Sequence, residues 1–544
     1  MSRVLVIGID GATLDLLGPW AEAGALPNLG RLMAEGTYGP LESTLPPVTA
    51  PAWPTFATGK NPGKHGVFDF IRPTGGRFEL VNASSLRAAT LWEILSAAGS
   101  RVGIMNVPIT YPPKPVNGFV IGGMLSPAGG AFTYPHDLLG RYEEDLQPYR
   151  IAPSVQYKEG NEESFIADLE ELVDRRSQYA LRLMEDHRYE FLMFHFQATD
   201  VLQHALWKLV DRSHPRYDGD AALRHGPRFQ SVFRRIDDTV GQMMDRLDDE
   251  STVIVMSDHG FGPLHYTVNV NLFLLDRGLL QLKGGAWTQL KTNLFRAGLT
   301  PASFWHLIER VGLQNYVWQV SKSTRNRIVS RFLSFDDVDW GRTVAYSIGH
   351  VGQIYLNRKG REPDGIVGPG EEYEVARRRV MEELQGLRHP ESGESLVDDL
   401  VPGDRVVHGP YASRGADLHL VLDGYRAIAF PLFAADHRII TSQIRGDSGC
   451  HRRHGLLIAW GEGIRPGGDV TGARIMDLAP TILHLMGLPV PDDMDGRVLD
   501  GVASTGRSVE YCREPLAGDG AEDGLSPEES AQVEERLRSL GYLG

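Results

Sequence analysis

The chain has 544 residues, 42% of them hydrophobic and 23% charged, which is typical of a globular protein with more than one structural unit. Its formal net charge of −15 argues against general nucleic-acid binding, because such proteins are usually basic. The two cysteines, Cys450 and Cys512, cannot form a disulfide framework, and the sequence shows neither a signal-peptide pattern nor an apolar run of about 18 residues. We therefore expect a cytoplasmic protein without a membrane-spanning segment.

The first 260 or so residues alternate between strand and helix patterns. Strands are predicted over 3–8, 101–105, 118–121, 191–196 and 252–256, and helices over 14–23, 91–98, 163–185 and 231–247. Alternation of this kind predicts an α/β fold with a mostly parallel sheet and helices on both faces. In such sheets ligands bind at the carboxyl ends of the strands.

The segment 46–66 places a threonine at the start of a predicted helix. Pro51 is compatible with the first turn of that helix, and Gly59 can end it. Backbone N–H groups at a helix start favour an anion, so the hydroxyl of Thr49 could attack phosphorus while those groups hold the phosphate oxygens. Thr49 could equally serve only as a helix cap. This segment alone does not separate the two interpretations.

From about residue 264 to residue 340 the pattern changes to short amphipathic helices. Between Lys283 and Arg331 the sequence holds eight basic residues and one acidic residue, Glu309. One interpretation is a solvated helical subdomain. The other is a cap that attracts an anionic substrate, or a patch that contacts an anionic membrane surface.

The rest of the chain returns to strand patterns and ends in a helix. Strands are predicted over 343–347, 353–356, 418–422 and 456–460, and a helix over 476–486. Ser526 and Glu529 form a capping box that predicts a last helix, docked on the body or on a partner. The expected organisation is a discontinuous core of residues 1–263 and 341–512, a basic helical insertion over 264–340, and a linker with a C-terminal helix over 513–544.

Possible metal ligands follow two of the early strands. Asp10 comes directly after the first strand, although Asp-Gly is also common in turns. Asp200 follows the strand 191–196, and His204 lies one helical turn further on, so both side chains could bind the same metal. The alternative for this pair is an N-cap aspartate and a surface histidine.

Two further loops add ligands of the same type. Asp258 and His259 follow the strand 252–256 beside two glycines, where a charged pair has little packing value. His451 lies just before the strand 456–460, with His454 as the competing choice. Oxygen and imidazole ligands suit Zn²⁺, with Mn²⁺ as the second choice. These ligands are sufficient for two metals. A two-metal site can clamp the attacking and leaving oxygens of an in-line displacement.

Together these motifs resemble the alkaline phosphatase superfamily, specifically its type I phosphodiesterase/nucleotide pyrophosphatase branch. The resemblance implies an alkaline-phosphatase-like central sheet and spans roughly residues 3–497. It implies one metal held by Asp10, Thr49, Asp258 and His259, and a second held by Asp200, His204 and His451. It also implies that Thr49 is the nucleophile.

One departure from the family pattern concerns substrate binding. Characterised nucleotide pyrophosphatases carry an asparagine shortly after the His-Gly that closes the nucleophile segment, whereas here residues 65–72 contain none. Asn106, just past the strand 101–105, is a candidate replacement donor or a simple turn residue. The segment around Thr49 also lacks the Cys/Ser-X-Pro-X-Arg motif of sulfatases, which disfavours sulfatase activity.

The sequence thus predicts a two-metal phosphoesterase that acts on a small phosphodiester, pyrophosphate or phosphomonoester through a phospho-threonine intermediate. The first alternative is a metal-dependent phosphomutase or phosphotransferase of the same superfamily. The second is a phosphate-binding or membrane-surface module without turnover. The leaving group and the oligomeric state are not determined by the sequence.

Overall fold

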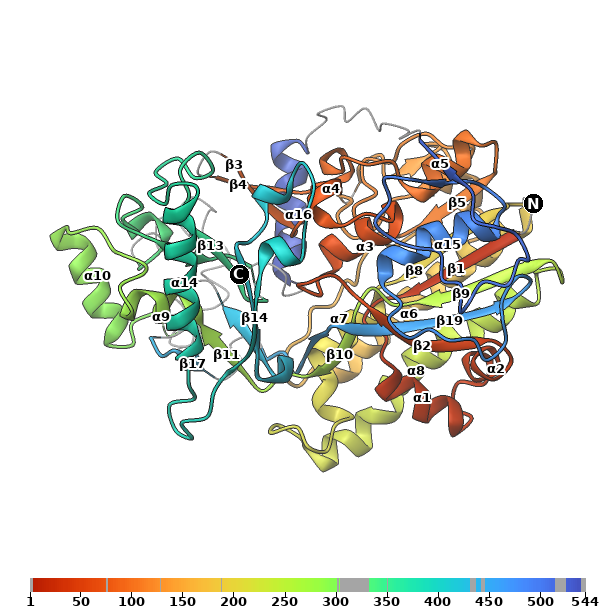
Figure 1. The fold of residues 1–544 in the computed structure, drawn as a ribbon. Coiled ribbons are helices and arrows are strands. Elements are labelled where there is room, and N and C mark those ends of the chain that lie inside the picture. The colour runs from red at the N-terminus through yellow and green to blue at the C-terminus, as the bar shows by residue number, and fades with distance from the viewer. Residues whose placement is uncertain are drawn as a thin grey trace.

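The computed structural model describes residues 3–74, 77–127, 129–186, 188–300, 303, 332–349, 351–430, 437–441, 446–513 and 525–539 (Figure 1). Within these ranges, none of the helices is both long enough and apolar enough to cross a membrane.

An eight-stranded sheet forms the centre of the larger unit, with strand order β2-β19-β9-β1-β8-β5-β6-β7. Its strands are β1 (Arg3–Ile9), β2 (Thr37–Glu42), β5 (Val102–Met105), β6 (Gly118–Ile121), β7 (Thr133–Tyr134), β8 (Phe191–Phe196), β9 (Ser251–Met256) and β19 (His454–Gly461). The five strands from β9 to β6 are parallel to one another, whereas β19 and β7 run antiparallel to their neighbours. The predicted mostly parallel sheet is therefore confirmed.

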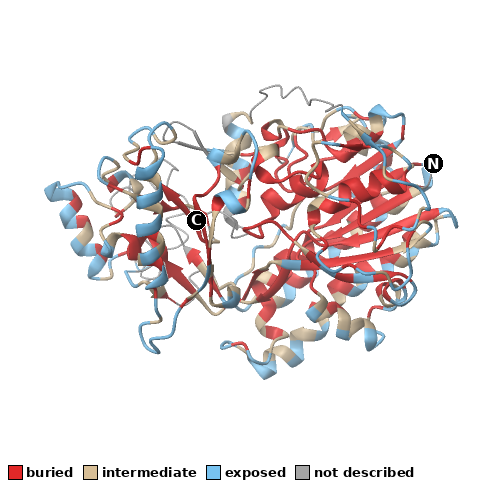
Figure 2. Cartoon of the chain, in the orientation of Figure 1, coloured by how far each residue is buried: buried red, intermediate tan, exposed pale blue. Residues whose placement is uncertain are grey.

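Helices cover both faces of this sheet (Figures 1 and 2). One face packs against α1 (Leu14–Glu22), α2 (Pro27–Glu35), α6 (Glu162–Asp186), α7 (Ala198–Leu206) and α8 (Gly219–Met244). The other packs against α3 (Thr49–Thr58), α5 (Leu91–Ala97) and α15 (Leu478–Leu485). Along β1, Leu5 and Ile7 belong to the first hydrophobic cluster, and Val4 and Val6 to the second. This alternation shows a strand buried on both sides.

A second unit lies beside the central sheet and has its own hydrophobic core. It contains the sheet β12 (Ala345–Ser347), β13 (Gln353–Leu356), β15 (Leu418–Leu422) and β14 (Val397–Pro402), the sheet β16 (Ala427–Phe430), β11 (Tyr266–Asn269) and β17 (Ile440–Thr441), and the helices α9 (Val270–Asp276), α10 (Ala286–Arg296) and α14 (Glu371–Gln385). Its core runs from Val268 to Ala429. The unit therefore does not end at residue 340 as expected, because β11 pairs with β16, far along the chain.

Only part of the expected basic insertion lies within the described residues. Lys283, Lys291 and Arg296 belong to it, and Lys291 is buried in an ion pair with Asp337, with Nζ 3.0 Å from Oδ1. The other five basic residues, Arg310, Lys322, Arg325, Arg327 and Arg331, lie outside the described residues. Short paired strands complete the architecture: β3 (Ile71–Thr74) with β4 (Arg77–Leu80), β10 (Gly260–Pro263) with β18 (Gly449–Arg452), and β20 (Val490–Pro491) with β21 (Tyr511–Cys512).

The last helix, α16 (Pro527–Ser539), packs next to the segment that contains Thr49. Ser526 and Glu529 form the capping box, with the Glu529 N–H donating to Ser526 Oγ at 3.2 Å. Val533 and Leu537 are fully buried in a cluster that also contains Val48 and Ala50, the neighbours of Thr49. Residues 514–524 of the expected linker lie outside the described residues.

Candidate metal centre and nucleophile

The carboxyl ends of β1 and β9 bring Asp10, Asp258 and His259 together. Gly8 pairs with Met256 in the sheet, so Asp10 and Asp258 each follow that pair by two residues. His259 Nε2 lies 3.3 Å from Asp258 Oδ2 and 3.6 Å from Asp10 Oδ1. All three side chains are fully buried, and one ligand atom from each lies within 4.8 Å of the others. This geometry suits a metal ion.

Asp200, His204 and His451 form a second group of the same kind. Asp200 and His204 lie one turn apart on α7, directly after β8. His451 comes from β18, which pairs with β10 just after His259. Asp200 Oδ1 is 3.2 Å from His451 Nε2 and 3.5 Å from His204 Nε2. His454 is exposed on β19 and is not part of this group, so the geometry favours His451.

All three histidines in these groups are oriented in the same way. Nδ1 lies 3.1 Å from the Gly260 carbonyl in His259, 3.1 Å from the Gly449 carbonyl in His204, and 2.9 Å from the Pro47 carbonyl in His451. A carbonyl only accepts, so each Nδ1 carries the proton, and each Nε2 can direct a lone pair into the site. The Nε2 atoms of His204 and His451 are only 2.9 Å apart. Imidazoles that bind a metal are typically held by such outer hydrogen bonds.

The threonine contacts the first of these two groups. Thr49 is the first residue of α3, and Gly59 ends that helix in the left-handed conformation, as predicted. The helix has no side-chain cap, and Thr49 Oγ1 instead lies 3.2 Å from His259 Nε2. The rings of His259 and His451 stack with centroids 3.6 Å apart, so the hydroxyl and both ligand groups share one buried site. The N–H groups of Thr49 and Ala50 have no acceptor within the helix and are available for a phosphate oxygen.

Three buried carboxylates in one site repel one another. Burial, together with Asp258 and Asp200, raises the pKa of Asp10 well above its ordinary value. Burial and the neighbouring Asp200 raise the pKa of Asp258 to about 7. Burial also opposes ionisation of Asp200, but His204 and His451 outweigh it and hold the pKa of Asp200 well below its ordinary value.

The residues present fit divalent cations. Asp10 Oδ1 and Asp258 Oδ2 are buried and accept no hydrogen bond from the described part of the chain. A cation would compensate these oxygens and remove the repulsion between the carboxylates. Mixed carboxylate and imidazole donors are appropriate for Zn²⁺ or Mn²⁺.

One residue of the site was missed by the sequence analysis. His195 lies in β8, fully buried, with Nε2 at 2.9 Å from Asp10 Oδ2 and Nδ1 at 2.9 Å from the Asn106 carbonyl. Burial and the charge of Arg176 lower the pKa of His195 to about 3. Burial thus disfavours the charged forms of both His195 and Asp10. The only sequence signal was a single ionisable side chain in an apolar strand.

The side chain of Asn106 is hydrogen-bonded within the protein. It has a positive φ of 66°, its Nδ2 lies 3.4 Å from the His195 carbonyl, and its Oδ1 accepts from the Tyr149 hydroxyl. These features fit the turn interpretation. Its backbone carbonyl orients His195, which in turn contacts Asp10.

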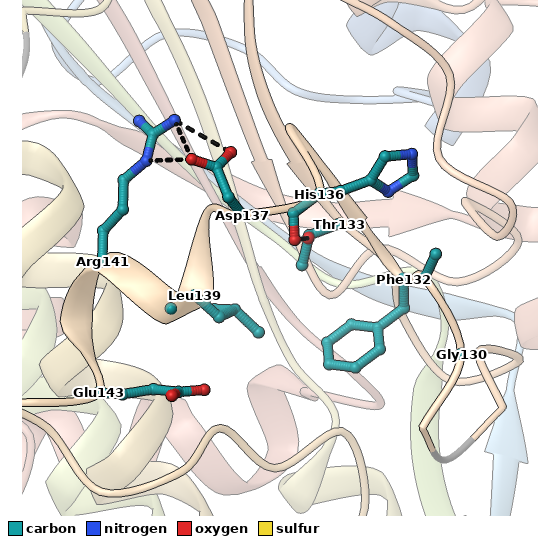
Figure 3. A pocket seen from close by; sticks show the side chains of 10 residues that line it. Gly130, Phe132, Thr133, His136, Asp137, Leu139, Arg141 and Glu143 are labelled. Atoms are coloured by element: carbon teal, nitrogen blue, oxygen red, sulfur yellow. Dashed lines mark hydrogen bonds and ion pairs between the residues drawn. The ribbon is translucent and has the colours of Figure 1, made fainter.

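A separate cavity of about 480 Å³ lies away from these residues, beside β7 (Figure 3). It is lined by Phe132, Thr133 and the ion pair of Asp137 with Arg141, among others. No predicted site residue is among its described lining residues. Although this cavity is large, we therefore do not consider it the candidate active site.

Comparisons with known proteins found a short sequence match and two similar structures. A stretch of 37 residues, 7% of this chain, is 57% identical to the 2,3-bisphosphoglycerate-independent phosphoglycerate mutase of Thermomicrobium roseum, and the match spans only 7% of that relative. Crystal structures of phosphonoacetate hydrolase from Sinorhizobium meliloti 1021, with phosphonoacetate and with phosphonoformate, are each 14% identical to this chain. Their TM-scores are 0.49 and 0.46, and both alignments cover 88% of this chain and 94% of the other.

The family comparison covers most of the chain. Residues 4–423 match the model of the type I phosphodiesterase/nucleotide pyrophosphatase family. This confirms the resemblance predicted from the motifs. The chain belongs to the type I phosphodiesterase/nucleotide pyrophosphatase family.

Proposed function

We propose that the protein is a two-metal phosphoesterase in which Thr49 is the nucleophile. The observation that carries this proposal is the position of Thr49 Oγ1. It lies at the start of α3 and 3.2 Å from His259 Nε2, a member of the first of two groups of possible metal ligands. Asp10, Asp258, His259 and Thr49 would hold one cation, and Asp200, His204 and His451 the other.

The reaction would proceed in two displacements. Thr49 Oγ1 forms a bond to phosphorus, the bond from phosphorus to the leaving oxygen breaks, and the hydroxyl proton is released, which gives phospho-threonine. Water then attacks this phosphorus and regenerates the threonine hydroxyl. The N–H groups at the start of α3 hold phosphate oxygens in both steps. Bound divalent cations, for which we propose Zn²⁺ with Mn²⁺ as the alternative, would polarise the reacting oxygens and offset negative charge.

The test is a comparison of wild-type protein with Thr49→Ala, each loaded with Zn²⁺ or Mn²⁺. Turnover is measured on 4-nitrophenyl phosphate and bis(4-nitrophenyl) phosphate, which also decides between monoester and diester preference. Thr49→Ala is expected to fold and retain metal but to lose at least about a thousandfold in kcat. A near-normal rate with metals bound would contradict the mechanism.

A phosphomutase or phosphotransferase is the second candidate. It is favoured by the short match to a 2,3-bisphosphoglycerate-independent phosphoglycerate mutase and by the complete burial of Thr49, which limits access of water. Both candidates share the phospho-threonine and differ in the group that accepts the phosphoryl. Turnover in ¹⁸O-labelled water separates them, since only hydrolysis places the label in released phosphate.

The predicted cytoplasmic location, the small phosphate-containing substrate and the absence of specific nucleic-acid binding also remain proposals. Contact of the basic insertion with a membrane surface is a further prediction. Flotation of the protein with anionic vesicles tests it.

A further inference from the structure

A small cavity separates the nucleophile segment from the four-stranded sheet of the second unit, which lies to the left of α3 in Figure 1. Leu45, Pro46 and Pro51 line one side of it. Thr49 lies between Pro46 and Pro51 in sequence and shares the first turn of α3 with Pro51. The wall of the cavity is therefore the same turn that carries the proposed nucleophile.

The opposite wall is the polar face of a sheet. Gln353 on β13 pairs with His419 on β15, and Tyr355 follows Gln353 by two residues, so all three side chains lie on one face. The other face of these strands carries apolar residues of the core of the second unit. A polar sheet face normally meets water, but Gln353, Tyr355 and His419 are only 2%, 7% and 5% exposed. The sequence thus provides hydrogen-bonding groups where apolar side chains would pack.

Two polar atoms in this wall have no partner among the described residues. Gln353 Oε1 and His419 Nδ1 are buried without a hydrogen bond to any described residue. Such groups are costly unless a ligand or water supplies the bond. The cavity volume is about 10 Å³, which matches one water-sized group such as a hydroxyl.

The charges around the cavity select against anions. No lysine or arginine is among its described lining residues. The carboxylate of Asp69 lies behind it, with Oδ2 accepting from Gln353 Nε2 at 3.0 Å. Burial lowers the pKa of His419 to about 4, so its imidazole is neutral near pH 7. A neutral hydroxyl suits these groups. A carboxylate or second phosphate would lie near Asp69, and Arg361, which lies over the Tyr355 ring, is already paired with Glu362 and Asp417.

We propose that this cavity is a specificity subsite for a hydroxyl group on the leaving alcohol, so that the substrate is a phosphoester of a neutral diol or polyol. Gln353 Oε1 accepts the proton of that hydroxyl, and His419 Nδ1 is the second hydrogen-bonding group. The cavity has room for that hydroxyl alone, and Pro46, Pro51 and Tyr355 line the space around it. The inference rests on the proposed function and deepens it, because it excludes anionic leaving groups such as glycerate.

The experiment compares three esters of similar size on the metal-loaded full-length enzyme. Glycerol 1-phosphate carries neutral hydroxyls, propyl phosphate lacks them, and 3-phosphoglycerate carries a carboxylate. Each alcohol can be supplied as a phosphate monoester or as a methyl phosphodiester. The form used for all three is the one that the wild type turns over faster. The measured quantity is kcat/KM for glycerol 1-phosphate divided by kcat/KM for propyl phosphate, because general damage to the site cancels in this ratio.

We expect wild type to prefer glycerol 1-phosphate over both other esters. Gln353→Ala and His419→Ala should each lower the ratio about tenfold, as expected for one lost hydrogen bond. Gln385→Ala, an exposed glutamine at the end of α14, is the matched control and should leave the ratio unchanged. An unchanged ratio in both cavity variants, or equal turnover of 3-phosphoglycerate and glycerol 1-phosphate by wild type, would overturn the subsite but not the phosphoesterase. Absence of turnover on all esters, the nitrophenyl esters included, would instead overturn the proposed function and this inference with it.

Discussion

Replacing Asp258 by asparagine is expected to stabilise the metal-free protein at pH 8, although it removes a proposed metal ligand. Burial and Asp200 raise the pKa of Asp258 from 3.8 to about 7. A carboxyl whose pKa is higher in the folded than in the unfolded protein lowers the free energy of unfolding as the pH rises from the unfolded pKa to the folded pKa. At about 1.4 kcal/mol for each tenfold change, the ionised carboxyl destabilises the folded state by about 4 kcal/mol at pH 8 and about 2 kcal/mol at pH 5.

The local contacts allow asparagine to fit. Asp258 Oδ1 accepts from the Gly11 N–H at 3.3 Å, and the side-chain oxygen of asparagine can retain that bond. The new amide can donate toward Asp10 Oδ1, which accepts no hydrogen bond from the described residues. The substitution therefore removes the repulsion between Asp258 and Asp200 and can add a hydrogen bond to Asp10.

The assay is thermal unfolding of wild type and Asp258→Asn in EDTA at pH 5 and pH 8, repeated with Zn²⁺ or Mn²⁺. We expect the Tm advantage of the variant to be larger at pH 8 than at pH 5. Added metal should raise the Tm of wild type much more than that of the variant. A variant that melts below wild type at pH 8 in EDTA, or an advantage equal at both pH values, would refute the reasoning.

Three further predictions concern individual residues. His451→Ala should lose one bound metal by elemental analysis after gel filtration, whereas the matched control His454→Ala should retain both; equal metal content in the two would contradict the ligand assignment. His195→Asn should weaken metal affinity about 10- to 100-fold in a competition titration, because His195 positions Asp10; unchanged affinity would remove that role. Leu537→Ala should destabilise the docking of α16 by about 2–5 kcal/mol, seen as faster proteolysis of the C-terminus, and an unchanged cleavage rate would argue against tight docking.

The parallel sheet made most of the candidate metal site predictable. Asp10, Asp200 and Asp258 each follow a strand, and the carboxyl ends of neighbouring parallel strands meet at one edge of the sheet. Chain order alone thus suggested that these side chains gather there. The helix of Thr49 was also predictable, because Pro51 and Gly59 mark its first turn and its end.

Features that depend on non-local pairing were not predictable. His195 lies within an apolar strand, and only the register of β8 against β1 places it next to Asp10. The strands β13 and β15 were located correctly, but their patterns could not show that they join β14 in a separate sheet. The boundary expected at residue 340 lies inside the second unit for the same reason, because β11 pairs with β16, far along the chain.

The central claim is that Thr49 carries the phosphoryl group during turnover. Metal-loaded protein is mixed with substrate in excess, quenched with acid within the first turnover, digested and examined by mass spectrometry. The account predicts one phosphoryl group on the peptide containing Thr49, localised to that residue and missing in Thr49→Ala. Product release by wild type with no phosphorylated peptide at any quench time, or with the phosphoryl group on another residue, would contradict it.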